Sequence, residues 1–463
     1  MAVLVPLLLG CAPAKLADDG DAGSSGSSSG SAAQTDDAGT SATTTGEGTT
    51  ASSADASSES STGEAPPVCG NGVVEGGEQC DGEPGCEDCA RTCSFGTPID
   101  LLLTAQSWTT STTVPVALTD GSGDLLVTSG AGLHRVAPDG TELWVQSEST
   151  STWRVLTMTA ADADSVWLGW ITDDDGWTAR YTRNAVADGS ELESFDVGDG
   201  AESSGDAVFA TPDALYVASS VTTPELGKFA RVEHRDAVGT AVQWTADLLD
   251  DGRDAYDSRF VLDLALGSDG TLFAAGAARL DADAIDNEIA ALAPDGTLRW
   301  RRSFDTSAQY GGARRPWPLT DGGVVTIVRE QHNDFGTVGN TPGFFTWLAR
   351  LDAEGEIAWQ VDPTDAIDEY RVQLTAVQPL DDRFVVAGAL VDDNGNAAAW
   401  LGYLDADGAL TCSTAVVHPN GEPAAIDAIF ATADGGLAVQ GFTDDDQPGS
   451  AATSRWYAPV YPY

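Results

Sequence analysis

Cysteines near the start of the chain are the densest group of residues whose type and spacing could do chemistry. Five of them lie within 25 residues, at Cys69, Cys80, Cys86, Cys89 and Cys93. In an exported chain this density favours disulfides over a metal site. Cys86 and Cys89 have the spacing of half a zinc site, but no second pair and no histidine lies near them.

Oxygen-bearing side chains lie between these cysteines, and oxygen ligands suit calcium better than zinc. The candidate calcium ligands are Asn71, Glu75, Glu78 and Asp81. The alternative is that these acids remain in contact with water on a disulfide-bonded loop. Calcium, held here or in acidic loops elsewhere in the chain, is the only ion that we expect, and no other cofactor is predicted.

The segment CGNGVVEGGEQCDGEPGCEDCARTC, residues 69–93, resembles the short Cys-rich repeats of secreted and surface proteins in myxobacteria and their relatives. The family pattern continues with a longer loop and two further cysteines, whereas this loop is short and holds an extra cysteine. Disulfide pairings therefore do not carry over. If Cys11 carries a lipid, the five cysteines and Cys412 make an even number that permits three disulfides. One of these could join the segment to the rest of the fold.

Catalytic motifs are missing from the sequence. The four histidines, His134, His234, His332 and His418, form no pair with metal-ligand spacing. No HExxH, P-loop or dinucleotide fingerprint occurs. The sequence thus favours binding over catalysis and predicts no catalytic residue. The alternative is an enzyme, either a hydrolase or lyase or a quinone-dependent oxidoreductase, with a site assembled from several repeats.

The first eleven residues, MAVLVPLLLGC, form an apolar run that is too short to span a bilayer. Its ending resembles the lipobox of bacterial lipoproteins, in which the chain is cut before a cysteine that then carries the lipid. The resemblance implies a signal peptide over residues 1–10 and lipidation of Cys11. The chain would then be exported and anchored at the outer membrane or cell surface of a Gram-negative bacterium. The basic segment usual in such signals is absent.

Residues 11–67 are rich in Ser, Thr, Gly, Ala and acid, with few large apolar side chains. Such a segment cannot bury enough surface to offset its ordering entropy, so a disordered tether is predicted. Its root-mean-square reach would be on the order of 40 Å. A Cys-rich module over residues 68–97 follows.

Seven similar hairpins lie between residues 113 and 441, each an apolar strand, a Gly/Asp turn and a second apolar strand. Their spacing of roughly 41 to 60 residues is typical of a four-stranded propeller blade. A second hairpin follows each of the first six copies, and its turn contains Gly140, Gly189, Gly239, Gly296, Gly355 or Gly408. Four of the strands that follow these turns contain a tryptophan, at Trp144, Trp244, Trp300 and Trp359. We expect these rings to pack between adjacent blades.

The seventh copy has only three strands before the chain ends at Tyr463. An apolar run, Pro98 to Trp108, lies where a fourth strand would precede the first copy. The sequence therefore predicts an all-β fold, a seven-bladed β-propeller over residues 98–463 closed by one N-terminal and three C-terminal strands. The repeats, several containing DGxLxW, resemble the β-propeller repeats of the pyrroloquinoline-quinone-binding type. Because the dehydrogenases of that family carry eight blades and an adjacent Cys-Cys pair at the cofactor, the resemblance implies the fold but not the cofactor.

Strand direction places the long irregular loops on one face of such a ring, and the tight turns on the other. The long loops are acidic and contain aromatic residues, and loops on a rigid scaffold are common recognition sites. Candidate binding residues on this face are Asp173, Asp175, Asp251, Tyr256, Tyr310, His332, Phe335, Tyr370, Asp392 and Asp445. The expected ligand is a glycan, a peptide or a protein. Solvated acidic loops without a ligand are the alternative.

The balance of charge argues against polyanionic partners. The chain has 22 Lys and Arg against 72 Asp and Glu, a net charge of -50. Nucleic acids and anionic lipid surfaces are therefore not expected to bind, because no basic patch could release counterions from phosphates. The predicted contact with a membrane is through the N-terminal lipid.

Overall fold

The computed structural model describes most of the chain from residue 98 onwards. The described ranges are 98–101, 116–118, 122–129, 132–147, 154–172, 178–197, 203–223, 227–248, 259–279, 285–308, 310–332, 343–367, 371–380, 383–392, 397–416, 424–432, 435–443 and 454–461, with the short strands 86–87, 90–91 and 94–95. The predicted signal peptide, tether and calcium ligands lie outside these residues. Among the residues described, no helix is long and apolar enough to cross a membrane.

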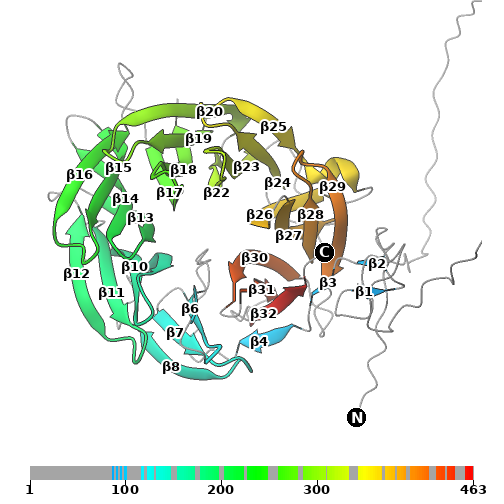
Figure 1. The fold of residues 1–463 in the computed structure, drawn as a ribbon, viewed down its shortest axis with the longest axis horizontal. Helices are drawn as coiled ribbons and strands as arrows, with labels where there is room; N and C mark the ends of the chain where they lie inside the picture. The colour runs from blue at the N-terminus through cyan, green and yellow to red at the C-terminus, as the bar shows by residue number, and fades with distance from the viewer. Residues whose placement is uncertain are drawn as a thin grey trace, which may run out of the picture.

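Seven antiparallel sheets are arranged as blades around a central channel (Figure 1), which confirms the predicted seven-bladed propeller. The innermost strands are β5 (Val116–Ala117), β9 (Arg154–Ala160), β13 (Ser203–Ala210), β17 (Arg259–Leu266), β22 (Arg314–Pro318) with the short β21 (Tyr310–Gly311), β26 (Arg371–Leu380) and β30 (Ala424–Ala431). The second strands are β6 (Leu125–Ser129), β10 (Ser165–Thr172), β14 (Ala214–Thr223), β18 (Leu272–Arg279), β23 (Val324–His332), β27 (Arg383–Val391) and β31 (Leu437–Thr443).

The outer half of each blade has the same antiparallel pairing. The third strands are β7 (Gly132–Val136), β11 (Thr178–Ala185), β15 (Gly227–Asp236), β19 (Ile285–Leu292), β24 (Gly343–Leu351), β28 (Ala397–Leu404) and β32 (Ser454–Tyr461). The outer strands are β8 (Glu142–Ser147), β12 (Glu191–Val197), β16 (Val242–Leu248), β20 (Leu298–Ala308), β25 (Ile357–Val361), β29 (Leu410–Val416) and, in the seventh blade, β3 (Ser94–Phe95) and β4 (Ile99–Leu101). A short hairpin of β1 (Cys86–Glu87) and β2 (Ala90–Arg91) and one 3-10 turn, η1 (Pro363–Ala366), complete the described elements.

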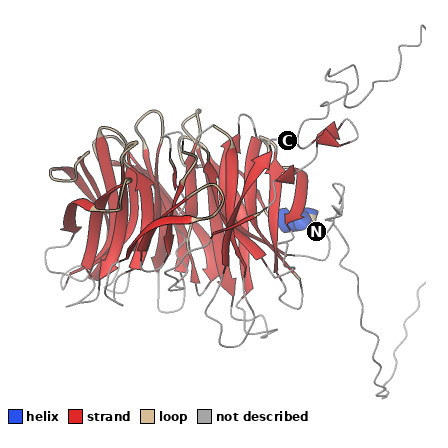
Figure 2. Ribbon diagram, turned by 90° about the horizontal axis from the view of Figure 1, so that it is seen from below, coloured by secondary structure: helices blue, strands red, loops and turns tan. Residues whose placement is uncertain are grey.

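The strands run between the two faces of the ring, so the connections gather at its two ends (Figure 2). The hydrophobic core is divided among the interfaces between blades. Val325 and Ile327 of the fifth blade, for example, pack against Val372 and Leu374 of the sixth. Each blade thus buries its two faces against two neighbours, which is the arrangement that repeats of this kind require.

A tryptophan on the outer strand of one blade holds the turn of the next. The indole Nε1 of Trp244, Trp300 and Trp359 donates to a carbonyl oxygen of that turn, at 2.9, 2.9 and 3.1 Å. Each indole ring lies against the turn glycine, so tightly that a Cβ at Gly355 would be 2.6 Å from Cδ2 of Trp300. The predicted structural role of these tryptophans is therefore confirmed. In the second blade Phe195 takes the equivalent place, against Gly239.

The ring closes through the N-terminal strand, as the sequence predicts. Residues Ile99–Leu101 pair with β32, and β3 pairs with the end of the same strand. Leu101 then packs against Val127 and Val136 of the first blade. The hydroxyl of Tyr457 donates to the carbonyl of Pro138, so a tyrosine makes at this seam the contact that tryptophan makes elsewhere.

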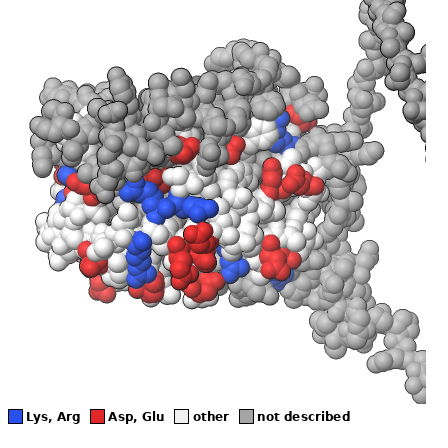
Figure 3. Space-filling model, turned by 90° about the horizontal axis from the view of Figure 1, so that it is seen from above, with Lys and Arg blue, Asp and Glu red and all other residues white. Residues whose placement is uncertain are grey.

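Basic and acidic side chains lie close together on the outer wall that carries β20 and β25 (Figure 3). Arg302 of the fourth blade is 3.4 Å from Glu356 of the fifth, and Arg350 is 2.8 Å from Asp321 within the fifth. The acids of both pairs are exposed and the arginines are partly exposed, so each pair contributes little to stability. The apolar interfaces and the tryptophan contacts hold the blades together.

We expect Gly355→Ala to destabilise the protein more than Gly435→Ala. Both glycines have φ of 84°, so alanine carries the same left-handed backbone cost of about 1–2 kcal/mol at either position. Only Gly355 lies against a tryptophan, whereas a Cβ at Gly435 would have no atom within 4 Å. Overpacking against Trp300 should add about 1–3 kcal/mol. Urea unfolding of both variants measures the difference, and equal midpoints would contradict the structural role of this contact.

Candidate functional site

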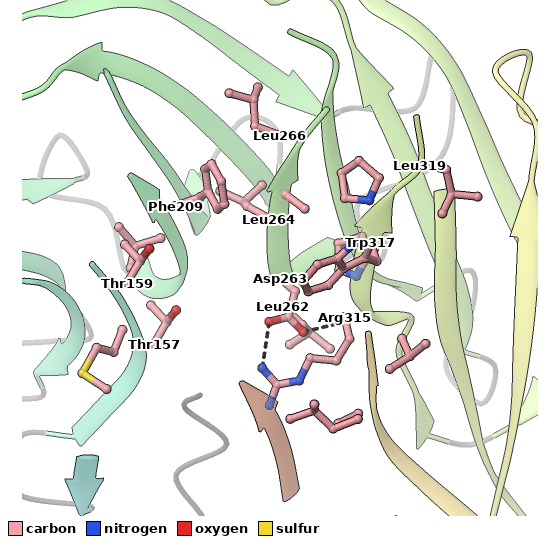
Figure 4. Close-up of a pocket in the computed structure, with 18 of the residues that line it drawn as sticks. Thr157, Thr159, Phe209, Leu262, Asp263, Leu264, Leu266, Arg315, Trp317 and Leu319 are labelled. Atoms are coloured by element: carbon pink, nitrogen blue, oxygen red, sulfur yellow. Dashed lines mark hydrogen bonds and ion pairs between the residues drawn. The ribbon is translucent and has the colours of Figure 1, made fainter. Parts of the chain in front are cut away.

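A cavity of about 440 Å³ lies in the central channel, among the innermost strands of six blades (Figure 4). Its walls come from the later parts of these strands and from the turns that follow β17 and β22, at Ser268 and Thr320. The cavity is therefore near the face that carries the tight turns. The long loops on which the sequence predicts binding lie at the other end of the strands, so this site is one that sequence reasoning did not find.

The cavity wall is largely apolar. Phe209, Leu264 and Leu266 line one part of it, and Trp317 and Leu319 line another (Figure 4). Trp317 is 37% exposed, unusual for a large aromatic side chain in the described part of this protein. Its ring therefore offers an apolar surface to a molecule in the channel.

One charged pair interrupts this wall. The backbone N–H of Arg315 donates to Oδ2 of Asp263 at 3.1 Å, and its Nη1 is 4.0 Å from Oδ1 of the same carboxylate. The Nη2 group donates to the backbone carbonyl of Asp427, on the seventh blade, at 3.4 Å. Arg315 therefore links the fourth, fifth and seventh blades. Its side chain is 15% exposed and that of Asp263 is 26% exposed.

Arg315 has φ of 53°, and it is the one described non-glycine residue with a positive φ. Such a conformation is strained and persists only where the surroundings impose it. Here β22 pairs irregularly with β23, with a register shift between Arg314 and Trp317. Pro316 and Pro318 have no backbone N–H to donate to a sheet, which explains why regular pairing is lost in this strand.

The segment before β22 is fixed by the fourth blade. The Oδ1 atom of Asn287 accepts from the backbone N–H of Gly312 at 2.8 Å and of Arg329 at 3.1 Å, while its Nδ2 donates to the carbonyl of Arg329 at 2.9 Å. Asn287 is fully buried. The backbone N–H of Ala313 donates to the carbonyl of Gly276 at 2.7 Å. These bonds set the position from which Arg315 enters the channel.

Two further arginines lie beside Arg315 in the fifth blade. Burial lowers the pKa of Arg314, and the nearby charge of Arg315 also lowers it while that of Asp263 raises it. Burial, and then the charge of Arg314, lower the pKa of Arg329 to about 10. Of the three arginines, Arg315 is the one that lines the cavity, together with Asp263.

The lining of the cavity has an apolar surface, threonine and serine hydroxyls and one Arg–Asp pair, with no histidine or cysteine. This arrangement can bind and orient a molecule, and it contains no paired nucleophile and base. In the described part of the chain no three His, Cys, Asp or Glu side chains group together as a metal site would require.

The predicted loop residues are described only in part. Tyr310 pairs with Gln331, next to His332, so the backbone of Tyr310 and His332 meets at one end of the fifth blade. Asp392 follows β27 and is half-buried. The other predicted face residues lie outside the described ranges, and they are Asp173, Asp175, Asp251, Tyr256, Phe335, Tyr370 and Asp445.

No family model matches the chain, and no curated protein sequence matches it. It is similar to hydrazine synthase of Kuenenia stuttgartiensis at 12% identity and a TM-score of 0.48, over 76% of this chain and 97% of that one. It is similar to quinohemoprotein alcohol dehydrogenase of Comamonas testosteroni at 11% identity and a TM-score of 0.47, over 80% and 76%. A chain of a mitotic checkpoint complex matches at 12% and 0.48, over 80% and 95%. These similarities carry no argument about the site.

We expect Arg315→Gly to be more stable than Arg315→Ala by about 1 kcal/mol. Both variants lose the contacts to Asp263 and Asp427, but only glycine adopts a φ of 53° without the left-handed cost. Arg314 is in the ordinary negative-φ range, so glycine relieves no strain there. Glycine only raises the conformational entropy of the unfolded state, so we expect Arg314→Ala to be more stable than Arg314→Gly. Urea unfolding of the four variants tests this, and alanine as the better residue at both positions would contradict a strained Arg315.

Proposed function

We propose that this protein is a membrane-anchored binding lipoprotein whose propeller holds a small molecule, or an extended group of a larger partner, in its central channel. The observation that supports the proposal best is the cavity of about 440 Å³ lined by apolar side chains and one Arg–Asp pair. Ligand sites are commonly concave, mostly apolar and supplied with a few placed polar groups. The rigid ring around the channel preorganises these groups, which reduces the entropy lost on binding.

Binding is favoured over catalysis by the chemistry of the lining. The carboxylate of Asp263 is held by the backbone and side chain of Arg315, so it is occupied in positioning that residue. The threonine hydroxyls at Thr157 and Thr159 have no histidine beside them among the lining residues. The face that carries the long loops, with Tyr310, His332 and Asp392, is a second surface that we propose for contact with a glycan, peptide or protein.

Trp317→Ala tests the channel as a binding site. We expect the neutral probe N-phenyl-1-naphthylamine to bind the purified protein, and the variant to bind it about fivefold more weakly, since an aromatic contact contributes about 1 kcal/mol. Leu298→Ala is the matched control, because Leu298 is 40% exposed but lies on the outer strand β20. Absence of probe binding, or equal weakening by the two substitutions, would contradict a channel site.

The lipid anchor rests on the likeness of Leu8 to Cys11 to a lipobox and on the polar segment that follows. Metabolic labelling with an alkyne analogue of palmitate should label the native chain and not the Cys11→Ser variant. The native chain should also fractionate with membranes. Equal labelling of both chains would refute lipidation at Cys11.

We also infer a disulfide between Cys412 and the N-terminal cysteines. Cys412 on β29 is 4% exposed and packs in the same cluster as Val460 of β32. Val460 pairs with Phe95, two residues after Cys93, so the chain that carries the N-terminal cysteines passes close to Cys412. Peptide mapping under non-reducing conditions should recover Cys412 in a cross-linked peptide that reduction releases. Recovery of Cys412 as a free thiol in the exported protein would refute the inference.

A further inference from the structure

Among the described residues that line the channel cavity, the charged ones are Arg315 of β22 and Asp263 of β17. Figure 4 shows their side chains next to each other, with Trp317 and Leu264 also on the cavity wall. Their formal charges cancel, although the whole chain has a net charge of -50. A ligand with a charge of one sign would be attracted by one of the two groups and repelled by the other. A ligand that has both charges matches both groups.

Asp263 has one carboxylate oxygen that faces this need. Its Oδ2 accepts from the backbone N–H of Arg315 at 3.1 Å, and this is the oxygen that positions the arginine. Its Oδ1 is 4.0 Å from Nη1 of Arg315, which is beyond hydrogen-bond distance. In the part of the chain that the structure describes, no other group donates to Oδ1. Because the side chain is 26% exposed and lines the cavity, Oδ1 can accept from an ammonium group in the channel.

Arg315 can bind a carboxylate at the same place. A guanidinium has five N–H donors in a fixed planar fork, so it can hold a carboxylate while its Nη2 keeps the 3.4 Å bond to the carbonyl of Asp427. The positive φ of 53° and the backbone bond to Asp263 fix the direction in which the side chain enters the channel. The cation and the anion of the protein therefore lie side by side, as the two charged groups do on the α-carbon of an amino acid.

The rest of the lining suits an apolar side chain. The ring of Trp317 is 37% exposed, and Phe209 and Leu266 lie on the same cavity wall (Figure 4). A sugar would place several of its hydroxyls against such apolar side chains, where they would lose hydrogen bonds to water without replacement. Ligand pockets range from roughly 300 to 1,000 Å³. The cavity of about 440 Å³ therefore suits a small ligand with one compact polar end.

We propose that the channel binds a zwitterionic α-amino acid with a bulky apolar side chain. Its ammonium group is bound by Asp263, its carboxylate by Arg315, and its side chain packs against Trp317. The proposal rests on the proposed binding function and specifies the class of ligand. Charge-assisted hydrogen bonds to both ends of the zwitterion, inside a cavity of low exposure, supply the selectivity against molecules that have only one of the two charges.

Four compounds with the same phenyl group test this assignment. L-phenylalanine has both charges, 3-phenylpropionate has the carboxylate alone, phenethylamine has the ammonium alone, and 3-phenylpropanamide has neither. Each is used to displace N-phenyl-1-naphthylamine from the folded full-length protein. L-phenylalanine should bind about tenfold or more tightly than each of the other three. Displacement by 3-phenylpropanamide at equal or lower concentration would overturn the proposal.

Asp263→Asn separates the two charges of the ligand. The change keeps the shape of the side chain, and the amide oxygen can still accept from the backbone N–H of Arg315. We expect L-phenylalanine to bind this variant about tenfold more weakly and 3-phenylpropionate to bind it about threefold more tightly, an opposite response that loss of folding cannot imitate. Arg350→Gln is the control, because Arg350 pairs with Asp321 on the outer wall, and it should leave both affinities within about twofold. Equal weakening of both ligands by Asp263→Asn would contradict the assignment.

Failure of this proposal is distinguishable from failure of the proposed function. If N-phenyl-1-naphthylamine does not bind the native protein, the channel is not a binding site and both proposals are wrong. If the probe binds and Trp317→Ala weakens it, but L-phenylalanine displaces it no better than the uncharged amide does, the channel is a binding site and the zwitterionic ligand is wrong.

Discussion

The stability of the ring depends on one contact between neighbouring blades, an aromatic ring that covers a turn glycine and donates a hydrogen bond to that turn. Trp244, Trp300 and Trp359 make it in successive blades. A single four-stranded sheet has two apolar faces and cannot bury either alone, so every blade depends on its neighbours. At the seam the last sheet joins the N-terminal strand to the C-terminal β32 by strand pairing, and Tyr457 makes the contact to Pro138 of the first blade there.

This closed ring also creates the site. Closure leaves the innermost strands facing one another across a channel, where their side chains line the cavity. In the fifth blade the channel strand is interrupted, because Pro316 and Pro318 cannot donate and Gly312 is held by Asn287 of the fourth blade. The irregular strand turns Arg315 toward the centre in a strained conformation. Strain of this kind occurs where the surroundings require a residue to point in a particular direction.

Electrostatics in this protein differ between the surface and the channel. Outer-wall pairs such as Arg302–Glu356 are exposed and contribute little. In the channel, Arg315 and Asp263 line the cavity as a pair whose side chains are only 15% and 26% exposed, so their charges are less screened. The net charge of the chain therefore does not describe the channel, where one positive and one negative side chain line the cavity.

The sequence by itself determined the repeat, the number of blades, the structural tryptophans and the closing strand near residue 99, because these depend on local patterns of apolar residues, glycine turns and spacing. It did not predict the channel site. The residues RRPWP, 314–318, show an arginine pair and two prolines that break the strand pattern, which is a local signal of irregular structure. Their partners, however, are Asp263 and Asp427, which are far away in sequence and belong to other blades. Only the packing of the blades around the channel brings them together, and no single segment determines that packing.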